Sequence, residues 1–221
     1  MPTISSTCAI LYYLAGSPQT RAKLQKELDE QLGTEDEIVA NSQQIKRLTY
    51  LDACINEALR LHSTSSLGLP RIVPEGGLTI VGQHLPAGAI VSVPSFSIHR
   101  DKTIWGEDVE TYRPERWFER NQADIQKTFN PFSTGPRQVF KKKNSLTGKK
   151  NDNFWLATFS FFYRACVGRN FAFLELQIII ASIMRRYDIC LAEEDQKVNI
   201  SDLILMIPFF FFSIADLKIF F

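Results

Sequence analysis

Cys166 is the residue of this chain best placed for metal chemistry. It lies two residues before Gly168 and shortly before a helix that is predicted to begin near Phe171. Unpaired backbone N–H groups and the helix dipole at such a position favour an anionic sulfur, which is the form of cysteine that binds a metal ion. The local sequence leaves a second interpretation open, that of a buried and chemically inert thiol.

The other cysteines and the histidines are predicted to be structural. Three cysteines lie in apolar runs and are interpreted as packing residues: Cys8, Cys54 and Cys190. The chain has no CxxC pair, which argues against a disulfide scaffold and against a structural zinc site. The histidines could act as bases or ligands but are interpreted as polar structural residues: His62, His84 and His99. A Cys–His hydrolase stays open as an alternative, although no pattern places a histidine beside Cys166.

Two charged patterns precede the cysteine. Glu57 and Arg60 are three residues apart on a predicted helix, so they are neighbours on one face of it. Taken alone, they are consistent with a surface ion pair worth well under ~1 kcal/mol. Arg116 belongs to the second pattern, Pro-Glu-Arg-Trp, within an ordered turn predicted over Tyr112–Trp117.

Helices predominate among the elements that must hold these residues in place. Apolar spacing predicts helices over four ranges: Ile4–Leu14, Pro18–Gly33, Thr49–His62 and Phe171–Tyr187. Two β runs, Leu78–Val81 and Ala89–Val93, have the spacing of a hairpin with a longer loop. An apolar content of 45% and a charged content of 22% exclude wholesale disorder and a polytopic membrane protein. The sequence therefore predicts one domain over residues 1–221, mainly α with a small β-sheet (α+β).

A third pattern completes an ordered set of motifs. It consists of Phe132–Arg137 followed, after a basic and aromatic stretch, by Ala165–Gly168. Together with Glu57–Arg60 and Pro114–Trp117 before it, this pattern resembles the C-terminal half of a cytochrome P450, a haem-thiolate monooxygenase. The Glu-x-x-Arg pattern alone occurs in many helices, whereas the three patterns in this order are specific. The local texture is most similar to fungal members of the benzoate 4-monooxygenase type.

The resemblance covers about residues 5–137 and 165–197. More than half of the usual family chain, including the membrane anchor, is expected to be absent, so the chain is interpreted as a truncated P450 domain. Residues 138–164 are interpreted as an atypical insertion in the haem-binding loop, and residues 198–221 as an atypical apolar tail. Both segments are similar to translated introns. The tail is interpreted either as a membrane-spanning helix or as an aggregation-prone segment.

The resemblance implies haem b as the cofactor, with Cys166 as the catalytic thiolate and axial ligand of the haem iron. It implies further haem contacts as follows: Arg71 and Arg137 with the propionates, Phe132 near the thiolate, and Gly168 where the backbone approaches the porphyrin. It also implies that Arg116 joins Glu57 and Arg60 in a buried network that holds the fold around the haem.

The activity implied is a monooxygenase reaction that inserts one oxygen atom of O₂ into a small organic substrate, and the resemblance to the benzoate 4-monooxygenase type implies an aromatic acid such as benzoate. The electrons would come from a donor of the NADPH–cytochrome P450 reductase type. Full-length eukaryotic members are expected to associate with the endoplasmic reticulum membrane, on its cytoplasmic face. No nucleic acid partner is expected, because the net charge is only +1. The alternative function is an inactive, mis-spliced or truncated fragment without catalysis.

Overall fold

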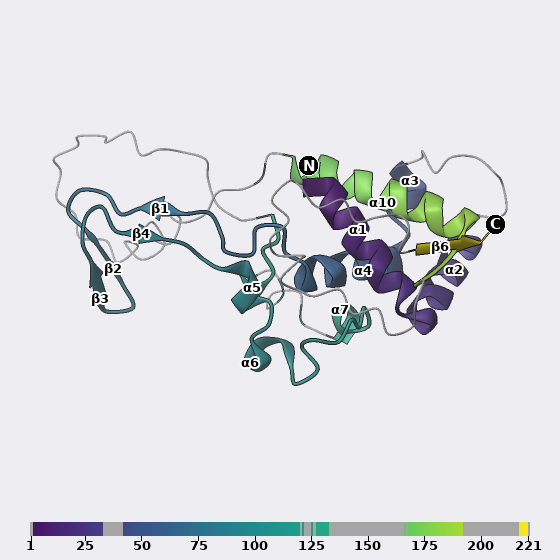
Figure 1. The fold of residues 1–221 in the computed structure, drawn as a ribbon, viewed down its shortest axis with the longest axis horizontal. Coiled ribbons are helices and arrows are strands. Elements are labelled where there is room, and N and C mark those ends of the chain that lie inside the picture. Colours follow the sequence, from purple (N-terminus) through teal and green to yellow (C-terminus); the bar gives the residue numbers. More distant parts are fainter. Residues whose placement is uncertain are drawn as a thin grey trace.

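Four helices form the main body of the computed structural model. The structure describes these residues: 2–32, 42–119, 121, 125, 127–132, 166, 168–191 and 217–220. The body consists of α1 (Pro2–Ala15), α2 (Pro18–Leu32), α4 (Thr49–Leu61) and α10 (Arg169–Arg186). All four pack on one another, and Figure 1 shows them gathered on one side of the molecule. The prediction of a helix-dominated fold with small β elements is confirmed.

The apolar spacing of the helices explains how the core forms. Leu24 and Leu28 of α2 are fully buried, while Lys23 and Lys26 on the same helix face solvent. The largest cluster of buried apolar side chains includes these from the other three helices: Ile10, Leu14, Leu51, Ile55, Leu176 and Ile180. Burying such side chains stabilises each helix against its neighbours by about 1.5–3 kcal/mol per residue. The predicted helix boundaries agree with the observed ones to within two residues.

A glutamate from α2 caps the N-terminus of α4. Leu48, at the N-cap position, provides no side-chain hydrogen bond. Instead the Glu27 carboxylate accepts the backbone N–H groups of Tyr50 at 2.8 Å and Leu51 at 2.9 Å. These are donors that the helix itself leaves unsatisfied. The cap also fixes the start of α4 against α2.

The predicted hairpin between Leu78–Val81 and Ala89–Val93 is wrong in its pairing. Strand β2 (Leu78–Ile80) pairs with β3 (Gln83–Leu85), and β1 (Arg71–Ile72) pairs with β4 (Ile90–Val91), both antiparallel. The reason lies in the two-residue turn between β2 and β3. Val81 has φ of 48° and Gly82 has φ of +78°, which is the conformation of a type I′ hairpin turn. The four strands form an arm that extends from the helical body (Figure 1).

Short helices lie between the elements of the body and after the arm: α3 (Ser42–Ile45), α5 (Ser95–Ile98), α6 (Lys102–Trp105) and α7 (Arg116–Glu119). The turn predicted over Tyr112–Trp117 therefore leads into a helical turn that begins at Arg116. A second apolar cluster joins this region to α4: Ala53, Trp105, Val109, Trp117 and Ile125.

The end of the chain contributes a strand. Strand β5 (Asp188–Leu191) pairs antiparallel with β6 (Leu217–Phe220), with Ile189 opposite Ile219. Residues 217–220 of the tail are thus a strand; residues 192–216 lie outside the described residues, so the interpretation of the rest of the tail stays a prediction. Within the described ranges, every helix is too short or too polar to cross a bilayer.

Candidate functional site

Glu57 lies at the centre of a buried ion network. The side chains of Glu57, Arg60 and Arg116 are all 0% exposed. Arg60 binds the carboxylate with two donors, Nε to Oε2 at 3.0 Å and Nη2 to Oε1 at 2.9 Å. Arg116 adds a third bond, from Nε to Oε1 at 3.0 Å. The structure therefore brings these three residues together, and the surface-ion-pair interpretation is wrong.

Two further donors to Glu57 were not predicted from the sequence. The backbone N–H of Arg113 donates to Oε1 at 3.2 Å, and Nε1 of Trp117 donates to Oε2 at 3.0 Å. A signal was available for Trp117, since it follows Arg116 directly and a buried indole N–H needs an acceptor. With five hydrogen bonds from described residues, the buried carboxylate has a partner for each lone-pair direction.

Arg60 and Arg116 also connect α4 to the segment that follows the arm. Arg60 donates from Nη1 to the carbonyl of His99 at 2.8 Å, and Arg116 donates from Nη1 to the carbonyl of Trp105 at 2.7 Å. Arg116 also bonds Asp108 Oδ1 at 3.1 Å. Arg60 and His99, for example, are 39 positions apart in the sequence. The network therefore holds segments that are distant in the sequence in one arrangement.

Cys166 lies at the entry to α10 with an exposed side chain. Its backbone N–H donates to the carbonyl of Phe132 at 3.2 Å, and its own carbonyl accepts the N–H of Arg169 at 3.3 Å. The structure thus joins Cys166 both to Phe132 and to the first turn of α10. This is the position expected for a thiol at a helix N-terminus.

Gly168 is the N-cap residue of α10, and its φ of −83° is open to any residue type. The conformation therefore does not require glycine. A Cβ atom built on Gly168 would lie 4.0 Å from the sulfur of Cys166. The missing side chain leaves space beside the thiol.

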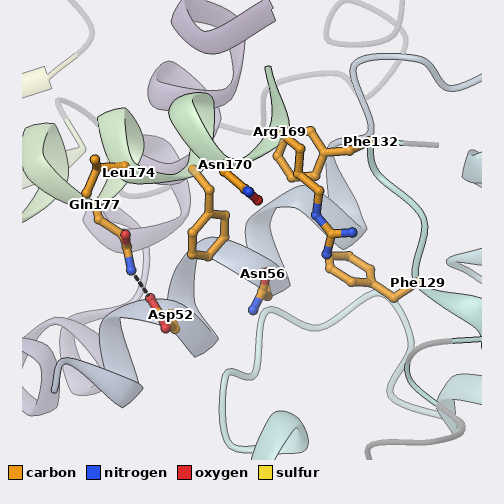
Figure 2. A pocket seen from close by; sticks show the side chains of 9 residues that line it. Asp52, Asn56, Phe129, Phe132, Arg169, Asn170, Leu174 and Gln177 are labelled. Carbon is orange, nitrogen blue, oxygen red and sulfur yellow. Dashed lines mark hydrogen bonds between the residues drawn. The ribbon is translucent and has the colours of Figure 1, made fainter. Parts of the chain in front are cut away.

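A pocket of about 350 Å³ lies between α4, α10 and the segment that ends at Phe132. Its lining is mixed, with aromatic rings, amides and two charged groups (Figure 2): Asp52, Asn56, Phe129, Phe132, Arg169, Asn170, Phe173, Leu174 and Gln177. The guanidinium of Arg169 lies 5.9 Å from the ring centre of Phe132. On the other side of the pocket, Gln177 donates to Asp52.

The two arginines predicted to bind propionates have different outcomes. Arg71 lies on β1, in the arm and apart from the groups above (Figure 1). Its Nε is buried and has no hydrogen-bond partner in the described part of the structure. A buried guanidinium N–H without an acceptor suits an anionic ligand. Arg137 lies outside the described residues, as does the insertion predicted over 138–164.

The histidines have structural environments. Burial, with the Arg100 charge adding to it, lowers the pKa of His62 to about 4, and burial and the Arg60 charge lower the pKa of His99 to about 4. Both rings are therefore neutral at pH 7; His62 hydrogen-bonds Ser5 at 2.9 Å, and His99 accepts the N–H of Asn130 at 3.1 Å. His84 is exposed on β3.

The other cysteines lie in environments that differ from that of Cys166. Cys54 is fully buried in the core, and burial raises the pKa of its thiol, as suits a packing residue. Cys8 and Cys190 are half-buried. Across the described ranges, no three His, Cys, Asp or Glu side chains gather in a way that could hold a metal ion.

Comparisons with known proteins agree with this geometry. The family model described as "Cytochrome P450" matches residues 1–138 and 140–209. Benzoate 4-monooxygenase bphA of Aspergillus niger is 38% identical over 195 residues, which is 87% of this chain and 32% of that protein. Cytochrome P450 monooxygenase cicH of Emericella nidulans is 33% identical over 202 residues, 90% of this chain and 35% of that protein.

A pisatin demethylase of Fusarium vanettenii is 35% identical over 188 residues, 85% of this chain and 31% of that protein. The chain thus spans about a third of the length of the curated relatives that it matches.

Proposed function

Because this chain belongs to the cytochrome P450 family, we propose that it forms the cysteine-bearing part of a haem-dependent monooxygenase. The observation that carries this proposal is the placement of Cys166. Its thiol is exposed at the start of α10, and its backbone is hydrogen-bonded to Phe132. The buried network around Glu57 holds the neighbouring helix α4.

The described residues fit a haem group. Cys166 offers an exposed thiol and Gly168 leaves space beside the sulfur, while Arg71, in the arm and apart from them, has a buried N–H without an acceptor among the described residues. The family implies haem as the cofactor. When bound, the haem would supply oxygen activation, which the electron density donated by a thiolate ligand favours.

Each residue of this chain then has a definite task. Cys166 would hold the haem iron through its sulfur, and the positive end of α10 would favour the anionic form of that sulfur. Arg71 pairs with a propionate carboxylate, a role also proposed for Arg137. Phe132, whose backbone carbonyl accepts the N–H of Cys166, would limit the access of water to the sulfur once haem is bound. The network of Glu57 with Arg60 and Arg116 fixes the scaffold and takes no part in turnover.

The proposed reaction inserts one oxygen atom of O₂ into a small organic substrate. An aromatic acid is the proposed substrate class, supported by the likeness to a benzoate 4-monooxygenase. The electrons come from a reductase of the NADPH–cytochrome P450 reductase type, and the cytoplasmic face of the endoplasmic reticulum membrane is the proposed location. The alternative of an inactive, mis-spliced fragment is not favoured, since the family match includes residues on both sides of Cys166.

Absorption spectroscopy tests the proposal. The chain is expressed with a haem precursor, reduced and exposed to CO. The expected result is a strongly red-shifted Soret band, as a thiolate-ligated haem gives. Cys166→Ala should abolish this band, and the matched variant Cys190→Ala should keep it. A red-shifted band that survives in Cys166→Ala, or its absence from the wild type, would overturn the proposal.

A further inference from the structure

One hydrogen bond across the pocket joins α10 to α4 and lies outside the Glu57 network. Nε2 of Gln177 donates to Oδ1 of Asp52 at 2.5 Å, although the two residues are 125 positions apart in the sequence. Gln177 is 8% exposed, and its amide is directed across the pocket at the Asp52 carboxylate. A buried polar group that loses its partner destabilises the fold. The bond is therefore a strong constraint on how α10 lies against α4.

The environment of Asp52 makes this bond sensitive to pH. Burial, partly offset by the Gln177 bond and reinforced by the Glu27 charge, raises the pKa of Asp52 to about 6. Among the charged groups on the packed elements, Glu27 of α2 acts electrostatically on Asp52, and Arg169 of α10 lies across the pocket (Figure 2). On α4 itself, Glu57 and Arg60 are paired with each other. The pocket beside Asp52 gives the carboxylate a route to water and hence to protons.

The geometry connects this bond to Cys166. Arg169, Phe173 and Gln177 recur every four residues along α10 and all line the pocket, so they share one face of the helix. Gln177 is about 12 Å along the helix axis from Arg169, at about 1.5 Å per residue. The N–H of Arg169 is bonded to the Cys166 carbonyl. A shift of this face of α10 is thus carried to the cysteine.

We propose that Asp52 and Gln177 are positioning residues whose hydrogen bond seats α10 on α4, and that protonation of Asp52 loosens this seat and changes the placement of Cys166. An ionised carboxylate accepts a stronger hydrogen bond than a neutral acid does. Where the inference concerns the haem iron, it rests on the proposed function.

The effect on global stability has the opposite sign to the effect on the bond. The pKa of Asp52 is higher in the folded chain than in the unfolded chain. Its contribution to stability is therefore fully present below about pH 4 and is lost as the pH rises through about 6. Ionisation of Asp52 strengthens its hydrogen bond with Gln177, but it also places a charge in a half-buried site. Because the pKa of Asp52 is raised, the cost of burying the charge is larger than the gain from the stronger hydrogen bond.

Thermal unfolding between pH 4.5 and 8 tests the inference without any need for haem. In Asp52→Asn nothing titrates at this position. The difference in Tm between wild type and this variant should fall as the pH rises through about 6. Gln177→Glu places a second carboxylate beside Asp52, so the midpoint of the transition should move upward by roughly one pH unit or more. Asp29→Asn, an exposed carboxylate on α2, is the matched control and should leave the profile unchanged.

The haem-loaded chain gives the second measurement. Its Soret band should shift with pH over the same range in the wild type and stay constant in Asp52→Asn. Parallel Tm profiles for the wild type and Asp52→Asn, or an unmoved midpoint in Gln177→Glu, would refute the inference. If every variant lacks a red-shifted Soret band, the proposed function fails, while the Tm comparison still decides the role of the Asp52–Gln177 bond.

Discussion

The Glu57 carboxylate shows why a single buried charge can hold several segments together. It accepts hydrogen bonds from both arginines, from a backbone N–H and from an indole N–H. Both arginines also bond backbone carbonyls elsewhere in the chain. Removing one partner from such a set leaves the other charges buried without compensation, which costs far more than a surface ion pair.

Glu57→Gln should therefore lower the free energy of unfolding by about 3–5 kcal/mol. The amide keeps the shape of the side chain but leaves the buried guanidinium of Arg60 without its anion and Arg116 with Asp108 as its remaining carboxylate partner. Denaturant unfolding followed by circular dichroism measures the change.

Glu110→Gln is the matched control for this experiment. Glu110 pairs with Arg100 at 3.1 Å, but its side chain is 58% exposed, so the loss should be at most about 1 kcal/mol. Equal losses in Glu57→Gln and Glu110→Gln would show that the buried network contributes no more than a surface pair.

The β arm depends on the turn at its tip, where Val81 carries an unfavourable backbone conformation. A β-branched residue with φ of 48° is strained, because its Cβ crowds the backbone in the left-handed region. Asn followed by Gly is the preferred pair for a type I′ turn. The side chain of Val81 is 90% exposed, so replacing it loses little apolar burial.

Val81→Asn should raise the stability of the chain by about 1 kcal/mol. Val81→Thr is the matched control, since threonine is polar but still β-branched, and it should give no comparable gain. Tm measured for both variants separates the backbone effect from the change in polarity. A gain in Val81→Thr equal to that in Val81→Asn would mean that polarity, and not φ, is responsible.

The whole molecule should be sensitive to acid because of two buried histidines. In the folded chain the pKa of His62 and that of His99 are about 4, below the ordinary value of 6.5. Between these values the unfolded chain binds more protons than the folded one. The stability from the two neutral rings is therefore present above pH 6.5 and is lost as the pH falls towards 4.

The free energy of unfolding should accordingly decrease from pH 7 to pH 4.5, and His62→Asn should show a shallower decrease. The titration of Asp52 changes the free energy of unfolding in the opposite direction over an overlapping pH range. The two histidines outweigh it, because Asp52 is a single group. Denaturant unfolding at a series of pH values measures the slope. A wild type that is more stable at pH 5 than at pH 7 would contradict this prediction.

Local patterns in the sequence predict the main helices, the family and the residues of the Glu57 network. Leucines four residues apart predict α2, since a helix turns once in 3.6 residues and places them on one face. The Glu-x-x-Arg pattern, Arg116 and Cys166 were identified in order along the chain, and the structure places Glu57, Arg60 and Arg116 in one network.

The remaining features depend on which surfaces meet when the chain folds. The pairing of β2 with β3 follows from a turn in which Val81 has a positive φ. Valine rarely adopts such a φ, so the residue type at this position does not predict the turn. The bond from Gln177 to Asp52 joins residues 125 positions apart in the sequence. No periodicity encodes such contacts, because they form only when packing brings two separate elements within hydrogen-bond distance.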